Sequence, residues 1–417
     1  MVATLAAAAI IAACGSGNAA KRQDATNEGA TSAPTFAPLP AVVQETLDAV
    51  AKLRGLSAPP ALRAKVVTRE EMPAAFEAAL TDDDRTWFAR TTTLYRLLGY
   101  LRADQDYYSL YVSLADSDIL GFYNPLNDTL VVGTEGGTAS FEALSAGERG
   151  VLVHELVHAI QDHHFRLDEK FKTVVDDLDR NLAYTAVVEG DANTHQQLYR
   201  RRAGLAAGPH VFLTLSGTQQ LPLPIAREFQ FPYTMGADWI TGVRGKGGTA
   251  AIDQLLETPP SGTWQVLHPD RTGFTPAEAP LPDLSRALGE GWNRDSGGTF
   301  GEFQWGNFLQ TRLRGLDSLA AASSWIGDGY GVYRNGGESI AVFSARTTAS
   351  GDAKLSAAVR EWIAGSRTHM TEGEHVAIGI ESDGRTFLIM DYPGGFLFVV
   401  ASNEALARRI PQALFSG

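Results

Sequence analysis

The sequence predicts an α+β fold, in which a mainly helical part with one β-hairpin precedes a smaller α+β part. Apolar residues recur at helical spacing in several segments between residues 41 and 201. Two short apolar runs flank a cluster of turn-forming residues within 121–133, as in a hairpin that offers an edge strand. After residue 281, strand and helix patterns alternate. We therefore expect two domains, 41–280 and 281–417.

The composition restricts the possible partners. The chain has 417 residues, 44% of them hydrophobic, which is enough to bury one large core or two modest ones. Its formal net charge of −13 argues against nucleic acid or an anionic membrane surface, because both bind basic patches. Beyond residue 14, no apolar run approaches the roughly 18 residues of a membrane-spanning helix. We expect no nucleic-acid partner, and membrane contact only through an N-terminal anchor.

The first forty residues resemble an export signal followed by a tether. Residues 1–13 form a short apolar segment with small residues before Cys14, the only cysteine. This is similar to a bacterial lipobox, in which the cysteine is lipidated and the preceding segment is removed. An ordinary secretory signal and a buried cysteine are the alternatives, and the lack of Lys or Arg before the apolar segment is consistent with a start upstream of Met1. Residues 14–40, rich in Gly, Ala, Ser, Thr and Pro, predict a flexible tether. We expect an exported protein, lipid-anchored to the cell membrane and facing outside the cytoplasm.

The elements of the first part follow from local signals. Residues 41–56 have apolar residues at helical spacing, with Gly55 as a stop signal, and similar patterns cover 70–80 and 86–101. The turn formers at 124–128 join the two strands of the hairpin. Ser145 and Glu148 form a capping box, which starts a helix through 151–165.

That helix carries a metal-binding pattern. His154 and His158 are four residues apart, so a helix presents both imidazoles on one face, with Glu155 beside them. His-Glu-x-x-His supplies two zinc ligands and a general base for a zinc-bound water. The surrounding residues are apolar, so the alternative is a pair of core histidines bonded to backbone. His163 and His164 follow polar residues, and we expect them in a solvated C-terminal turn.

A catalytic zinc takes three protein ligands, and Glu189 is the third candidate. It lies in the apolar part of a helical pattern at 181–201, where a carboxylate is costly unless it is paired or metal-bound. A salt-bridged core carboxylate is the alternative, and His195 is a rival ligand whose polar neighbours suggest an exposed face. Small residues at Gly190 and Ala192 would let this helix approach the first one closely. Hydrogen-bond acceptors for the ligand imidazoles are expected among Asp162, Asp191 and Asn193.

The chain resembles a family of exported prokaryotic zincin-like proteins of the gluzincin type. The shared motifs are HELVHAIQDH at 154–163, with His163 where Gln is usual, EGDA at 189–192, GFYNP at 121–125, FPYTMG at 231–236, PPSGTWQVLHP at 259–269, GEFQWGNFL at 301–309 and WIGDGYGVY at 325–333. They run from about residue 41 to about 350. The resemblance implies one Zn²⁺ per chain, held by His154, His158 and Glu189, with Glu155 as the base. Asn193 stands where many gluzincins carry a carboxylate, which leaves the acceptor for the imidazoles open.

Stabilising the oxyanion of a tetrahedral intermediate needs a donor besides the metal. Tyr233, at the start of a predicted helix, and His268, in a loop, are the candidates, with packing or turn structure as the alternative. Residues 327–330 read as a turn, and 301–316 as one helix.

These features predict a zinc metallopeptidase that acts on a peptide or protein substrate, with strand 129–132 holding the substrate by strand addition. A non-catalytic surface module with structural zinc is one alternative. A metallohydrolase acting on a non-peptide amide or ester is the other.

Overall fold

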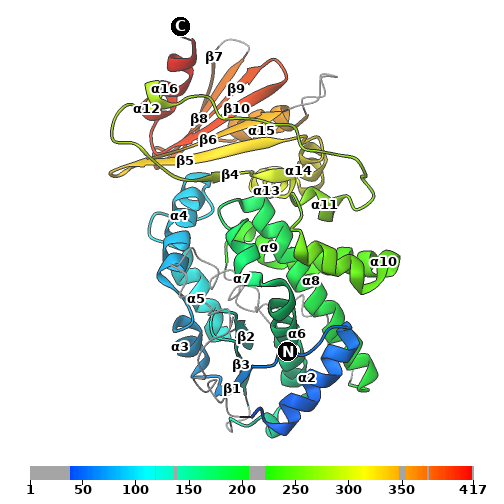
Figure 1. Cartoon of the computed structure of the whole chain (residues 1–417). Helices are drawn as coiled ribbons and strands as arrows, with labels where there is room; N and C mark the ends of the chain where they lie inside the picture. Colours follow the sequence, from blue (N-terminus) through cyan, green and yellow to red (C-terminus); the bar gives the residue numbers. More distant parts are fainter. Residues whose placement is uncertain are drawn as a thin grey trace, which may run out of the picture.

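The computed structural model describes residues 38–117, 119–135, 139–205, 221–346, 354–372 and 375–415. It is 52% helical and 18% strand, which confirms the predicted α+β class. The predicted signal segment, Cys14 and nearly all of the predicted tether lie outside the described residues. Within the described part of the chain, no helix is both long and apolar enough to cross a bilayer. The helices form one end of the molecule and a large sheet forms the other (Figure 1).

The first helices begin and end where the sequence signals lie. Helix α2 (Ala41–Arg54) stops at Gly55, whose left-handed φ of 80° suits a glycine. Helix α4 (Asp82–Leu98) starts with a capping box between Thr81 and Asp84. The remaining elements of this region are α3 (Met72–Glu77) and α5 (Tyr107–Ser117).

A three-stranded sheet lies beside these helices, and it corrects one prediction. Its order is β1 (Arg63–Thr68), β3 (Thr129–Thr134), β2 (Gly121–Asn124), so the predicted hairpin is β2–β3. Strand β3 pairs in parallel with β1 and antiparallel with β2. The strand expected to offer an edge at 129–132 is therefore central, because β1 pairs with its far side. The sequence does not reveal this pairing, because three helices separate β1 from the hairpin along the chain.

Two long helices cross behind this sheet. Helix α6 (Ala146–Phe165) begins at the predicted capping box of Ser145 and Glu148, after the short helix η1 (Phe141–Ala143). Helix α8 (Leu178–Arg202) packs against α6 and follows α7 (Leu167–Lys172). Helix α2 lies across both of them (Figure 1).

A close backbone approach joins α8 to the segment after it. That segment contains α9 (Leu223–Gln230), a π-helical turn η3 (Pro232–Gly236), α10 (Ala237–Glu257) and α11 (Trp264–Leu267). A Cβ on Gly190 would lie 2.7 Å from the Gly236 carbonyl oxygen. Gly190 therefore permits contact with η3, and not with α6 as predicted, while Ala192 does pack in the core shared with α6.

The last part of the chain is a seven-stranded antiparallel sheet in the order β4-β5-β6-β10-β9-β8-β7. Alternate residues of β9 face opposite sides: Phe387 packs in the core that contains Trp362 of α15, and Leu388 in the one that contains Leu406 of α16. Helices thus cover both faces. The strands are β4 (Asn293–Gly298), β5 (Asp328–Asn335), β6 (Glu338–Arg346), β7 (Thr368–Glu372), β8 (Val376–Ile380), β9 (Thr386–Tyr392) and β10 (Gly395–Ala401). The helices are α12 (Ser285–Leu288), α13 (Gly301–Leu309), α14 (Gly315–Ala322), α15 (Lys354–Ala364) and α16 (Glu404–Phe415).

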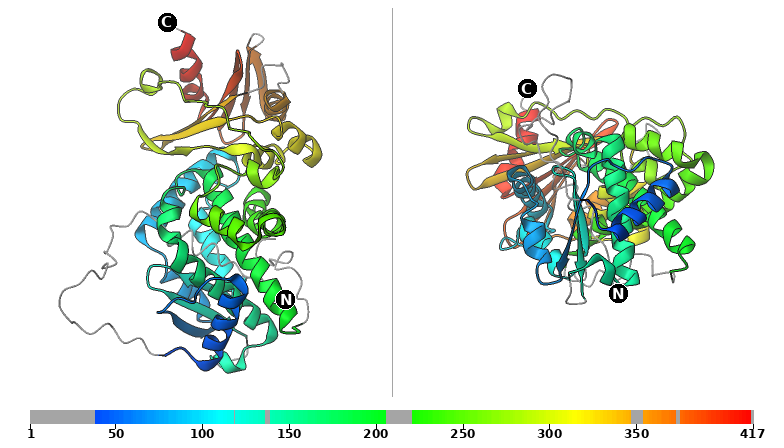
Figure 2. Two further views of the ribbon diagram at one scale, coloured as in Figure 1. Left: turned by 45° about the vertical axis from the view of Figure 1, so that its right-hand side comes forward. Right: turned by 60° about the horizontal axis from the view of Figure 1, so that its bottom comes forward.

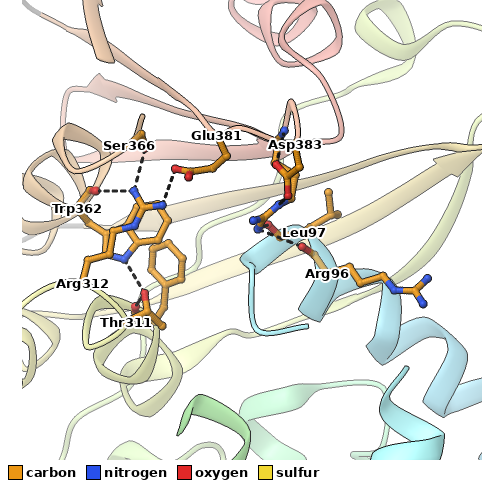
Figure 3. A network of polar contacts seen from close by, with 10 residues as sticks. Arg96, Leu97, Thr311, Arg312, Trp362, Ser366, Glu381 and Asp383 are labelled. Atoms are coloured by element: carbon orange, nitrogen blue, oxygen red, sulfur yellow. Dashed lines mark hydrogen bonds and ion pairs between the residues drawn. The ribbon is translucent and has the colours of Figure 1, made fainter. Parts of the chain in front are cut away.

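Two predictions in this part are wrong. Residues 327–330 are not a turn, because β5 begins at Asp328, whose buried carboxylate accepts hydrogen bonds from the Phe300 and Gly301 amides and from two indoles. The helix predicted over 301–316 breaks between α13 and α14. Arg312, in the break, stacks on Trp362 at 3.7 Å from the ring centroid and forms an ion pair with Glu381 (Figure 3). These tertiary contacts favour a turn there over continued helix.

The helical part and the sheet share one core. A single cluster of buried side chains contains Phe88 and Tyr107 from the helices together with Phe343 and Phe398 from the sheet. At its edge, the guanidinium of Arg385 donates to two carbonyls at the end of α4, those of Arg96 and Leu97 (Figure 3). Figure 2 shows the sheet seated directly on the ends of the helices. The two predicted domains thus share one core across their boundary, beside clusters that belong to the helical part or to the sheet part alone.

Candidate metal centre

Helix α6 presents His154 and His158 side by side, as the four-residue spacing predicts. Their ring centroids are 4.6 Å apart, and both side chains are fully buried. Glu155, between them in sequence, is also fully buried. The residues around this helix are apolar on all sides and exclude water. Polar side chains buried among them therefore need a partner, either another group of the protein or an ion.

Helix α8 supplies the third side chain, Glu189. Its two carboxylate oxygens lie 3.0 Å from His154 Nε2 and 3.2 Å from His158 Nε2. Among the described residues, His154, His158 and Glu189 are the group of potential ligands that converges closely enough to hold a metal ion. A tetrahedral zinc with bonds of about 2.0–2.1 Å holds its ligand atoms about 3.3 Å apart, so this donor set fits zinc.

Unsatisfied polar atoms support the same fit. His158 Nε2 and Glu189 Oε1 face each other at 3.2 Å without forming a hydrogen bond and have no other partner among the described residues, and neither oxygen of Glu155 has a hydrogen-bond partner there. A buried carboxylate without a partner is costly, and buried charges are normally paired or metal-bound. The two Glu155 oxygens therefore call for an ordered water or an ion beside the ligands.

Without a metal ion, the charges of the protein favour a proton bound at this site, and a cation would replace that proton. Burial opposes ionisation of Glu189, but His158 and His154 outweigh it and lower the pKa of Glu189 to about 2. Burial likewise lowers the pKa of His158, but Glu189 more than reverses this and raises it to about 9. Burial, with a further contribution from Glu189, raises the pKa of Glu155 to about 8. A divalent cation would displace the proton on His158, because metal ligands must be deprotonated.

A chain of hydrogen bonds behind His158 fixes its ring. His158 Nδ1 lies 2.9 Å from Gln161 Oε1, and Gln161 Nε2 donates to Asp191 Oδ2 at 2.8 Å. Asp191 in turn accepts from Arg54 of α2 at 3.0 Å and lies 2.8 Å from His195 Nδ1. Metal-bound imidazoles normally donate their other N–H in this way, which leaves Nε2 of His158 for the metal.

This network changes the predicted roles of several residues. Asp191 reaches the imidazole only through Gln161, which the sequence reasoning missed. Asp162 accepts from the Tyr123 hydroxyl and the Leu167 amide. Asn193 is buried, and neither its amide atoms nor His154 Nδ1 has a hydrogen-bond partner among the described residues. His195 is fully buried, not exposed as predicted, because its ring pairs with Asp191.

The two oxyanion candidates lie in different surroundings. Tyr233, in η3, is buried and lines a cavity together with Thr185, one turn before Glu189 on α8. His268, at the end of α11, has its Nε2 2.7 Å from Glu302 Oε1. On α6, His163 is exposed and His164 hydrogen-bonds to Ser57, in agreement with the predicted solvated turn.

Strand β2 passes directly over the centre of α6. A Cβ on Gly121 would lie 2.6 Å from Val151 Cγ1 and 3.3 Å from Glu155 Cγ. Glycine is therefore required for the strand to lie this close to Glu155. Within the described residues β2 pairs only with β3, and all four of its residues are buried.

Gln161, Arg54 and Gly121 were not predicted as parts of the site. The position of Gln161, three residues after His158, was a usable signal, whereas Arg54 is separated from Asp191 by 137 residues. Comparison of the chain with models of protein families, with curated proteins and with solved structures finds no match. The candidate site therefore rests on its own geometry: three buried ligand groups, an unpaired carboxylate and a supporting hydrogen-bond chain.

Proposed function

We propose that the protein is a zinc-dependent peptidase, with zinc held by His154, His158 and Glu189. The observation that carries the proposal is the fully buried Glu155, whose two oxygens lack any partner among the described residues beside this ligand set. A site that binds zinc only for structure has no use for such a carboxylate. The resemblance to zincin-like proteins of the gluzincin type agrees with this assignment.

The residues divide the work of hydrolysis between them. A bound zinc would polarise the scissile carbonyl and lower the pKa of the attacking water. Glu155 would accept the proton of that water and deliver it to the leaving amine. Gln161 orients His158, and β2, the last strand of its sheet, would replace the central strand 129–132 as the strand that holds the substrate backbone by strand addition, once a substrate displaces what buries it. Tyr233 is the better placed oxyanion donor, because it lies in the cavity next to Glu189.

Two conservative substitutions separate the ligand from the base. Glu155→Gln keeps size and removes basicity, so zinc content should stay near one ion per chain while turnover falls at least about a hundredfold. Glu189→Gln replaces an anionic ligand by a weak neutral one, so zinc affinity should fall and activity should return partly with added metal. Metal analysis and cleavage of a peptide library measure the two effects.

Controls and contrary results are available within the same helix. His163→Ala changes an exposed histidine of α6 outside the ligand set and should retain zinc. Unchanged zinc content in both His154→Ala and His158→Ala would refute the metal site. A Glu155→Gln variant as active as wild type would refute the mechanism, and zinc binding without cleavage of any peptide would favour a hydrolase of non-peptide amides or esters.

We further propose that the protein works outside the cytoplasm, anchored by a lipid on Cys14. The support is the apolar segment before this cysteine and the low-complexity tether after it.

A further inference from the structure

A cavity begins one turn away from Glu189 and is lined mostly by aromatic rings. Its volume is about 80 Å³, well above the roughly 10–15 Å³ that a single water needs. On α8, Asn181 and Thr185 line it, and Glu189 is the next residue at the same four-residue spacing. With a rise of about 1.5 Å per residue, the cavity extends from about 6 to about 12 Å from Glu189 along the helix. The aromatic residues of its wall are Trp87, Tyr95, Tyr107, Tyr111, Phe229 and Tyr233.

Two polar groups of this cavity are a buried carboxylate without a cation and an amide oxygen without a donor among the described residues. Glu228 is 8% exposed, and its carboxylate accepts hydrogen bonds from the Tyr95 hydroxyl and the Gln304 amide. No Lys or Arg in the described part of the chain forms an ion pair with Glu228, although buried carboxylates are normally paired. Gln304 Oε1, 2% exposed as a residue, has no hydrogen-bond partner among the described residues. A ligand group that suits this end must donate hydrogen bonds.

The walls favour the same kind of ligand. The rings of Tyr95, Tyr107, Tyr111 and Phe229 form a continuous cluster with centroids 5.1–6.3 Å apart. Aromatic faces attract ammonium and guanidinium groups, while the methylene stem of Lys or Arg packs on them as an apolar chain. A purely apolar side chain would fill the space but leave Gln304 Oε1 without a donor and Glu228 without a cation.

We propose that this cavity is the specificity pocket of the peptidase and takes a Lys or Arg side chain next to the cleaved bond. The proposal rests on the peptidase function proposed above. Glu228 lines the same cavity as Thr185 and Asn181, so a long side chain that enters it beside Thr185 would bring its cation to this carboxylate. The formal charge of −13 on the chain also attracts basic peptides. Burial raises the pKa of Glu228 to about 7, so the carboxyl group can ionise near neutral pH when a cation enters.

Binding of small probes tests the pocket without catalysis. N-acetyl-lysine amide and N-acetyl-norleucine amide share the same apolar stem, and only the first carries an ammonium group. Titration of the full chain by NMR or calorimetry should show the lysine probe binding at least about tenfold more tightly. Glu228→Gln should weaken the lysine probe about ten- to a hundredfold, the usual share of a charge-assisted hydrogen bond.

Matched variants keep this test interpretable. Glu302→Gln makes the same change in a buried carboxylate that does not line the cavity, and should keep wild-type affinity. Gln304→Met removes the unpartnered acceptor, together with the hydrogen bond that the Gln304 amide donates to Glu228, and leaves the Glu228 carboxyl group itself in place. It should also weaken the lysine probe, so the proposal can still be tested if Glu228→Gln unfolds. Equal or tighter binding of the norleucine probe by wild type would overturn the proposal, as would full lysine affinity in both pocket variants.

Cleavage mapping separates this proposal from the peptidase function. Mass spectrometry of a digested peptide library should find Lys or Arg beside the cut bond, and a loss of that preference in Glu228→Gln. Zinc-dependent cleavage beside Leu or Phe would overturn the pocket assignment and leave the peptidase function intact. Binding of the lysine probe that depends on Glu228, in a protein that cuts no peptide, would support the pocket and refute the peptidase.

Discussion

Arg54 offers the sharpest test of how the metal centre is supported. Its guanidinium is fully buried, donates from Nε to Asp191 at 3.0 Å and forms a second ion pair with Asp253. Arg54→Met keeps most of the volume and leaves the Asp191 carboxylate buried, with the Gln161 amide as a donor and His195 Nδ1 2.8 Å away. Removing one partner of a buried ion pair costs about 3–5 kcal/mol, and the two remaining contacts favour the lower end. We expect the free energy of unfolding to fall by about 3 kcal/mol.

Urea unfolding of zinc-loaded and chelated protein measures this loss. Adding Asp191→Asn should recover roughly 2 kcal/mol of it, because the second change removes the unpaired charge. Zinc affinity should also fall, by up to about tenfold, since Asp191 holds the Gln161 amide that orients His158. Arg102→Met, which removes an exposed ion pair with Asp104, should leave the midpoint unchanged. Wild-type stability in Arg54→Met, or strictly additive effects in the double variant, would refute this reasoning.

Two other predictions concern distant parts of the chain. Because burial raises the pKa of Glu228 from 4.5 to about 7, the folded state holds this proton more tightly than the unfolded state. Stability should therefore fall by roughly 2–4 kcal/mol as pH rises from about 4.5 to about 7, and urea unfolding of Glu228→Gln should lack this component. A pH dependence identical to wild type would contradict it. Cys14→Ser should abolish lipid labelling and release the protein from the membrane fraction; membrane association that persists without lipid would mean that the apolar segment is a retained anchor.

Local signals in the sequence were sufficient where neighbours along the chain decide the structure. The capping box at Ser145, the four-residue spacing of His154 and His158, and the glycine stop at Gly55 all reappear in the structure. Glu189 was predicted because a carboxylate in an apolar helix needs a partner, and the structure places it against both histidines. Each of these inferences used one helix turn or the cost of burial.

The failures share a cause, which is pairing between distant segments. Strand β3 is central because β1 pairs with it, and no local pattern reveals a partner 66 residues away. His195 looked exposed from its polar neighbours, but it is buried beside Asp191, whose partner Arg54 lies 137 residues away. Gly190 was expected to allow a close approach of α6, but the residue that lies close to it, Gly236, comes from a later segment. Contacts of this kind depend on the whole fold.

The late position of Gln304 in the sequence means that the cavity is completed after the metal ligands have been synthesised. This side chain comes from α13, on the border with the C-terminal sheet, yet it completes a cavity whose other walls come from α4, α5, α8, α9 and η3. About 115 residues separate it from Glu189, so at about 5–20 residues per second it emerges from the ribosome roughly 6–23 s later. A nascent chain would thus contain every proposed metal ligand before it contains Gln304, which completes the proposed substrate pocket. Selectivity for the substrate side chain would therefore arise later in synthesis than the capacity to bind zinc.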